Sequence, residues 1–196
     1  MTNEIELNAD QIVAAAVEIL HERGLDAVSM RSVAGRLGVT PPPLYARIGN
    51  KDALLDAIAE HFLVDLAPAV ENDEPWQDYA RRWTQEMRKR LTEASDSRLF
   101  LQLKRPTYLE ATRPLLKCLR RNGMSKDGAV RACRLLTWAT VGFVAMDHPP
   151  SAAPSRPRNR LAGSDPAGVT SEEIDELFTI HIGYLIDGIG RDEEMR

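Results

Sequence analysis

Residues 28–55 read VSMRSVAGRLGVTPPPLYARIGNKDALL and contain two short helical patterns separated by a tight turn. Ser29 is suited to cap the first helix, which should end at Gly38 after about two turns. Thr40 is suited to cap the second helix, whose first turn is Pro41–Pro43. Proline is tolerated there because the first N–H groups of a helix have no internal partner. Two short helices joined in this way are typical of a helix-turn-helix unit, although small helical bundles contain similar turns.

Periodic apolar residues predict one buried helix before this unit and one after it. Asn8 begins a capping-box pattern for a helix over about 9–23. Asn50 is suited to cap a helix over about 51–67. We therefore expect an all-α fold whose N-terminal domain, at 1–50, is a three-helix helix-turn-helix domain, followed by a linking helix.

The charge distribution supports a nucleic-acid partner more than the net charge does. The chain carries a net charge of -4, which alone argues against such a partner. Residues 1–70 hold five Lys or Arg against ten Asp or Glu, yet between Ala27 and Lys51 there are four bases and no acid. This basic island within an acidic segment is either a selected surface or an accident of composition, and the sequence pattern around it decides between the two. Within it, Arg36 is expected to be a solvated charge.

The identities of these residues resemble the DNA-binding domain of the tetracycline-repressor (TetR) family of bacterial regulators. The resemblance is carried by Ala34, Leu37, Gly38, Val39, Leu44, Tyr45, Asn50, Lys51, Leu54 and Leu55. It implies that the helix after Thr40 enters the major groove of a palindromic operator, where base edges carry a readable pattern of donors and acceptors.

The resemblance also implies which side chains contact DNA. Phosphate contacts, which position a protein without reading sequence, are expected from Ser29, Arg31, Tyr45 and Lys51. Sequence specificity is expected from Thr40, Pro41, Pro42, Pro43 and Arg47, with the prolines offering apolar surface to thymine methyl groups. The family usually has Tyr or His where this chain has Arg47. Two interpretations of that residue stay open: a bidentate contact with guanine or a contact with phosphate.

Helical periodicity continues beyond Pro75 and predicts five further helices, at about 76–93, 96–103, 108–121, 126–146 and 172–189. We expect residues 68–196 to form a helical ligand-binding and dimerisation domain. The broad apolar stripes at 126–146 and 172–189 predict a four-helix homodimer interface, although core packing accounts for some of these positions. A symmetric dimer matches the inverted repeat of a palindromic operator. The Pro- and Ser-rich segment at about 148–170 is predicted to be a mobile loop.

The second half is similar in patches to the ligand-binding domain of tetracycline repressors, with Arg105–Thr107 among the shared landmarks. The resemblance implies that an effector binds beside this turn, that the helix at 51–67 swings as a lever, and that DNA is released. A small, largely apolar or aromatic effector fits the candidate pocket residues, each of which is also a credible core residue. These residues are Trp83, Met87, Leu103, Arg105, Tyr108, Leu116, Trp138 and Phe178.

The effector is not expected to be tetracycline with magnesium. The polar drug and metal contacts of tetracycline repressors fall on Ala67, Trp83, Leu101 and Met146, which lack the oxygen ligands that a hard cation needs. No metal and no cofactor are predicted. Residues 98–134 hold ten Lys or Arg against two acids. They form either a solvated basic face or a site for an anionic ligand.

Other function classes find less support. No nucleophile triad, glycine-rich phosphate loop or paired-carboxylate motif is recognisable, so an enzyme is not expected. The N-terminus does not resemble a signal peptide, and we expect a cytoplasmic protein without a membrane segment. Cys118 and Cys133 are expected to be thiols that are buried or have no functional role. The alternative to a regulator is a helical scaffold that binds another protein without ligand-controlled DNA binding.

Overall fold

The computed structural model describes residues 7–66, 68–69, 74–94, 96–101, 105–147 and 170–194, and every regular element in these ranges is helical. The predicted all-α fold is confirmed. The predicted loop at 148–170, apart from its last residue, lies outside the described residues, as do Leu103 and the side chain of Arg105. The helices are α1 (Ala9–Arg23), the 3-10 helix η1 (Leu25–Ala27), α2 (Met30–Leu37), α3 (Pro41–Ile48), α4 (Lys51–Leu63), α5 (Trp76–Glu93), α6 (Arg98–Leu101), α7 (Arg105–Arg121), α8 (Lys126–Asp147) and α9 (Ser171–Glu194).

Two helix boundaries differ from the sequence prediction in an informative way. Helix α4 ends at Leu63 rather than near residue 67, because Val64 is extended and Asp65 adopts a left-handed φ of 53°. Helix α7 begins at Arg105, three residues earlier than predicted. Its second residue, Pro106, does not prevent this, since proline is compatible with the first turn of a helix.

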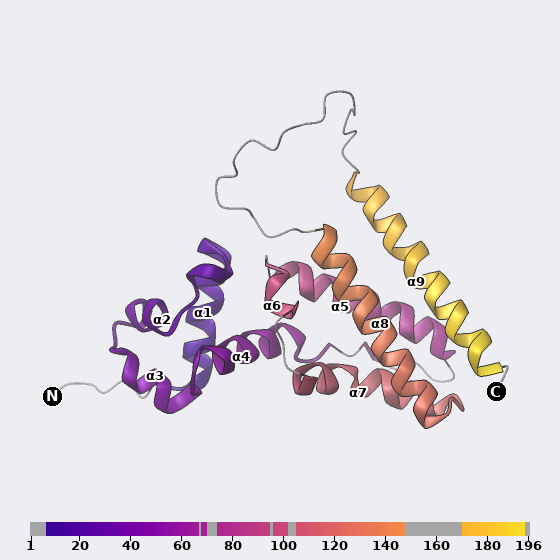
Figure 1. Cartoon of the computed structure of the whole chain (residues 1–196), viewed down its shortest axis with the longest axis horizontal. Coiled ribbons are helices and arrows are strands. Elements are labelled where there is room, and N and C mark those ends of the chain that lie inside the picture. The colour runs from indigo at the N-terminus through magenta and orange to yellow at the C-terminus, as the bar shows by residue number, and fades with distance from the viewer. Residues whose placement is uncertain are drawn as a thin grey trace.

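Helices α1, α2 and α3 gather at one end of the molecule, which we call the head (Figure 1). Leu44 of α3 is fully buried in the hydrophobic core. Capping boxes close the N-termini of α1, through Asn8, and of α2, through Ser29 and Ser32. The Ser32 hydroxyl also donates to the carbonyl of Ala27 at 2.7 Å, which fixes α2 against the η1 turn. Local hydrogen bonds therefore define where the helices of the head begin.

Helices α5, α7, α8 and α9 build the C-terminal part, where α8 contacts each of the other three (Figure 1). The side chains of Trp83, Met87, Leu115 and Leu136 are completely buried between them. Burial of each such side chain contributes about 1.5–3 kcal/mol to the stability of the fold. This packing sets the positions of the effector-site candidates.

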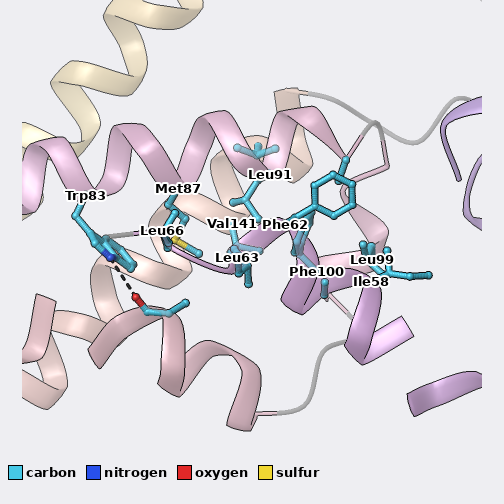
Figure 2. Packing of buried hydrophobic residues seen from close by; sticks show 14 of the residues in the cluster. Ile58, Phe62, Leu63, Leu66, Trp83, Met87, Leu91, Leu99, Phe100 and Val141 are labelled. Carbon is cyan, nitrogen blue, oxygen red and sulfur yellow. Dashed lines mark hydrogen bonds between the residues drawn. The ribbon is translucent and has the colours of Figure 1, made fainter. Parts of the chain in front are cut away.

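Helix α4 runs from the head into this second core. Figure 2 shows Ile58, Phe62 and Leu63 among the side chains of Leu91 and Phe100. The Phe62 and Phe100 rings meet edge to face with centroids 6.3 Å apart. Helix α4 also packs against α1, and the centroid of the Phe62 ring lies 6.0 Å from that of the His21 ring. The linking helix predicted from the sequence is therefore part of both packing units.

Helix α8 is long and apolar enough to cross a membrane by length and composition, with a mean hydropathy of 1.3 in its best window. An apolar window of this length was not predicted from the sequence. In the fold, α8 packs against α5, α7 and α9, and 44% of the window is buried inside the protein. Central helices of water-soluble proteins share these properties.

Candidate nucleic-acid interface and effector site

Helix α3 presents an exposed face opposite its buried anchor, Leu44. Tyr45 is 53% exposed, and Pro42, Pro43 and Arg47 are exposed beside it. An isolated two-turn helix is unstable in water, so the burial of Leu44 is what holds this face in place. The arrangement leaves an accessible face for the major groove, which admits one helix.

Thr40 is the N-cap residue of α3, as predicted, but its side chain makes no capping hydrogen bond. An N-cap oxygen normally accepts from the N–H of the second or third helical residue. Those residues here are Pro42 and Pro43, which have no N–H. The exposed Thr40 hydroxyl is therefore left available to a partner outside the chain.

Three exposed basic residues surround this face: Arg31 on α2, Arg47 on α3 and Lys51 at the start of α4. Within the part of the chain that the structure describes, none of them takes part in an ion pair. Lys51 is held at the first turn of α4, whose N-cap Asn50 accepts a hydrogen bond from the N–H of Ala53 at 2.9 Å. The surface therefore offers uncompensated positive charge, which phosphates attract.

The prediction for Arg36 was wrong. Its guanidinium bridges two carboxylates of α1, with a distance of 2.9 Å to Glu18 and a shorter contact to Glu22. The hydrogen bond from Arg36 lowers the pKa of Glu22 below its ordinary value. Arg36 therefore joins α2 to α1 through ion pairs, whereas a solvated charge was predicted.

A polar junction joins the head to the C-terminal part. The buried carboxylate of Asp96 accepts from the backbone N–H of Leu25, and it pairs with Arg98 at 2.7 Å. Arg98 reaches back to Asp26 of the η1 turn at 3.0 Å. Nearby, His21 Nε2 lies 3.1 Å from the carbonyl oxygen of Glu93. These contacts fix η1 and the end of α1 against the segment between α5 and α6.

The effector-site candidates do not gather around one described cavity. Trp83, Met87 and Phe178 are buried, and the Trp83 indole donates to the carbonyl of Ala111 at 3.2 Å. Tyr108 is partly buried and donates its hydroxyl to the carbonyl of Phe100, and burial raises its pKa above the ordinary value.

Two other candidates lie nearer the surface. Leu116 is half-buried against the core. Trp138 lies apart from the candidates in the core, because its side chain points outward and is 68% exposed.

Sequence reasoning missed Arg88, which lies among the aromatic side chains between α5, α8 and α9. Its guanidinium carbon is 4.7 Å from the ring centroid of Phe178 and 5.6 Å from that of Phe143. It also pairs with Asp175 at 2.8 Å. Cation–π contacts and an ion pair thus hold α9 to α5 and α8. An arginine among apolar positions of α5 was the one signal in the sequence.

A groove with a volume of about 440 Å³ opens between the end of α4 and α7. None of the predicted site residues whose side chains the structure describes lines this α4–α7 groove. Its lining residues are Glu60, Leu63, Val64, Asp65, Leu66, Glu110, Ala111 and Pro114.

Helices α8 and α9 share an exposed apolar face, which we call the α8–α9 face. It consists of Leu135, Trp138, Leu177, Ile180 and Tyr184, which are 41–75% exposed. A groove of about 220 Å³ lies beside it, with Leu135 and Tyr184 among its lining residues. Contiguous exposed apolar side chains of this size are typical of an interaction surface.

Among the described residues, no three His, Cys, Asp or Glu side chains cluster closely enough to hold a metal ion. The two cysteines are free and buried. Burial raises the pKa of the Cys133 thiol to about 12, so this thiol stays protonated at neutral pH.

Comparison with known proteins identifies the family. The sequence pattern of "Bacterial regulatory proteins, tetR family" matches residues 12–58, which run from α1 into α4. The class G tetracycline repressor of Vibrio anguillarum is 30% identical over 200 residues, and the match covers 95% of each chain. The chain belongs to the TetR family. The class A repressor of Escherichia coli is 32% identical to this TetR family member over 145 residues, which cover 71% of the chain and 66% of that repressor, just under two thirds.

Solved structures of TetR proteins share the fold of this family member. The TetR protein of Acinetobacter baumannii AYE is 28% identical, with a TM-score of 0.76 over 96% of this chain and 99% of that one. A variant of that protein in complex with minocycline gives a TM-score of 0.78 at 27% identity, with the same coverage. The predicted recognition is confirmed: this chain is a member of the TetR family with a helix-turn-helix head.

The positions that correspond to the tetracycline contacts differ widely in solvent exposure in this TetR family member. Leu101 is 60% exposed and Met146 is 86% exposed, whereas Trp83 is buried, and Ala67 lies outside the described residues. Most of the described basic side chains at 98–134 are exposed, whereas Arg98 and Arg131 are partly buried and form ion pairs. The exposed members include Arg113, Lys117, Arg120, Arg121, Lys126 and Arg134. This exposure favours the solvated basic face over the anionic-ligand site.

Proposed function

We propose that this regulator is a ligand-responsive repressor that binds an inverted-repeat operator as a homodimer in the cytoplasm. The observation that carries the proposal is the exposed α3 face, with the free Thr40 hydroxyl and the unpaired bases Arg31, Arg47 and Lys51 around it. Such a surface combines base-reading groups on one helix with phosphate-binding groups on its neighbours. The tetracycline repressors named above are regulators, which supports a role in regulation rather than catalysis.

The α8–α9 face supports the homodimer. Two heads must be held at a fixed spacing to meet successive major grooves on one side of the duplex. The exposed side chains of Trp138 and Tyr184 offer a large apolar area to a second copy. Gly183 and Gly188 lie inside α9, and an added Cβ would meet nothing within 4 Å at either position. Glycine inside a helix costs about 1 kcal/mol relative to alanine, a cost that close approach of a partner helix can offset.

The position of α4 supports release by an effector. Helix α4 packs against α1 of the head and also against α5, α6 and α7. A small, largely apolar or aromatic molecule that changes the packing of the C-terminal part would therefore move the helix that carries the head. A ligand shifts the equilibrium between two such arrangements only by its difference in affinity for them.

Selection from a random duplex library tests the proposal, followed by binding of the winning duplex at increasing salt. We expect an inverted repeat bound by a dimer, with affinity that falls steeply as salt rises. Arg47→Ala should weaken binding, while Arg121→Ala, which removes an exposed charge from α7, should leave it unchanged. If Arg47→Ala relaxed the sequence preference at a single base pair, Arg47 would be assigned to guanine. If the variant lost affinity equally for all sequences, and the slope of log affinity against log salt concentration fell by about one, Arg47 would be assigned to phosphate.

Two results would contradict the proposal. If Tyr45→Phe and Arg47→Ala both left operator affinity unchanged, α3 would not be the DNA-contacting helix. If a folded dimer enriched no duplex, the helical protein-interaction scaffold would become the better description.

A further inference from the structure

The α4–α7 groove has the size and the floor of a small-molecule site. Its floor is formed by Leu63, Leu66 and Ala111, which are 4%, 2% and 7% exposed, and Val64 stands 56% exposed on its wall. A volume of about 440 Å³ lies within the range of ligand sites in proteins, which are concave and mostly apolar. An apolar body can therefore be accommodated there.

Among the described residues, the charged side chains that line the groove are all acidic. They are the carboxylates of Glu60, Asp65 and Glu110, and no described lysine, arginine or histidine is part of the lining. Glu110 pairs with Arg113 at 2.6 Å, but both side chains are more than half exposed, and an exposed pair of this kind is weak. Within the described ranges, neither Glu60 nor Asp65 takes part in an ion pair. The described lining of the groove therefore carries a negative charge, although Asp65 also lines a neighbouring hollow whose lining includes Arg82 and Lys89.

Pro114 adds to this polarity. It lies inside α7, and because proline has no N–H it cannot donate to the carbonyl of Glu110, four residues earlier. That carbonyl lacks its usual helical donor at the groove wall. A carbonyl oxygen without a donor carries partial negative charge, which has the same sign as the three carboxylates.

We propose that the α4–α7 groove binds a hydrophobic organic cation, whose positive charge lies among the three carboxylates and whose apolar body rests on the floor. Cation binding itself does not depend on the proposed function, whereas its effect on operator binding rests on that function. Since Glu60, Leu63 and the three residues after α4 line the groove, a bound cation would contact the helix that joins the head to the second core.

Two ions of the same shape and opposite charge test the proposal: tetraphenylphosphonium and tetraphenylborate. Titration calorimetry of the full chain should show the phosphonium binding at least about tenfold more tightly than the borate, as expected when a few screened charge pairs favour one ion. The preference should shrink as salt rises. Equal affinities, or a preference for the borate, would overturn the proposal.

A triple variant and a matched control locate the binding. Glu60→Gln, Asp65→Asn and Glu110→Gln together should abolish the preference for the phosphonium; asparagine tolerates the left-handed conformation at residue 65. The control variant carries E172Q, E173Q and E176Q, which make the same charge change on exposed α9. A control that loses the preference, or a triple variant that keeps it, would place the binding elsewhere and refute the assignment to the groove. E60Q alone, a smaller change, should reduce the preference part of the way.

Operator binding, measured separately on the same protein, distinguishes this inference from the proposed function. If the chain binds its operator but binds the two ions equally well, the repressor function is supported and the cation site is excluded. If the chain prefers the phosphonium but enriches no duplex, the cation site is supported and the repressor function is excluded. When both hold, the phosphonium should lower operator affinity in the wild type and not in the triple variant.

Discussion

Leu25 and Asp96 are 71 residues apart in the sequence, yet the backbone N–H of Leu25 donates to Oδ2 of Asp96 at 3.2 Å. Burial raises the pKa of Asp96, but hydrogen bonds from Arg98 and from two backbone N–H groups outweigh that effect, so the pKa lies below its ordinary value. A lowered pKa in the folded state means that ionised Asp96 stabilises the fold. The contribution is present above the unfolded-state pKa of about 3.9 and is lost as pH falls through the lower folded pKa.

Replacing Asp96 should therefore weaken the fold in a pH-dependent way. Asp96→Ala leaves the Leu25 N–H without its acceptor and should lower the free energy of unfolding by about 1–3 kcal/mol at pH 7. The difference from wild type should shrink below about pH 4. Urea denaturation at several pH values measures both effects. Asp26→Asn, which alters the exposed partner of Arg98, is the control and should cost about 0–1 kcal/mol. An Asp96→Ala cost that did not change with pH would contradict this account.

The two helix caps of the head should respond differently to the loss of a hydroxyl. Ser29→Ala removes a capping box and should lower the free energy of unfolding by about 0.5–2 kcal/mol. Thr40→Ala should change it by less than about 0.5 kcal/mol, since the Thr40 side chain caps nothing. Thermal denaturation compares the two variants. Equal losses of stability would mean that the Thr40 hydroxyl is engaged within the chain.

Gly35 inside α2 and Gly38 at its C-cap form a second matched pair of substitution sites. Gly35 lies inside the helix, and an added Cβ would meet nothing within 4 Å, so Gly35→Ala should raise the free energy of unfolding by about 0.5–1 kcal/mol. Gly38 has a φ of 69° and ends the helix in the left-handed region. Gly38→Ala should therefore lower stability by about 1–2 kcal/mol. Denaturant titrations should give opposite signs, and two changes of the same sign would count against the described geometry.

The α8–α9 face predicts the assembly state. Trp138→Glu places a charge in the proposed dimer interface and should convert the dimer to a monomer in analytical ultracentrifugation, because an unpaired charge is costly to bury there. Leu109→Glu is the control, since Leu109 is similarly exposed, at 65% against 68%, but lies on α7. The Leu109 variant should stay dimeric. A dimer that survived Trp138→Glu would rule out this face as the interface.

The helices of the head could be predicted from sequence because their signals are local. Caps at Asn8 and Ser29 and the glycine at residue 38 determine helix ends through neighbours only a few residues away. The partner of Arg36 could not be predicted in this way. Its carboxylates lie on another helix, and which faces meet depends on packing of the whole head.

The C-terminal part shows the same limit more strongly. Helical spacing assigns Trp138 to an apolar stripe but does not tell whether another helix of the same chain covers that stripe. Arg88 illustrates the converse, since its contacts with Phe178 and Asp175 join it to another helix and could not be read from local sequence. The α4–α7 groove unites residues about 50 positions apart, and no motif marks it.

Because α4 supplies side chains to both packing units, we expect no boundary between the head and the C-terminal part at which unfolding could stop. Ile58 and Phe62 cannot leave the second core without loosening the helix that also packs against α1. Head and C-terminal part should therefore melt in one cooperative transition, and a molecule bound far from the head would still raise its melting temperature. Stability and signal transmission depend on the same helix, so mutations that strengthen it are expected to make the regulator more robust and less responsive at once.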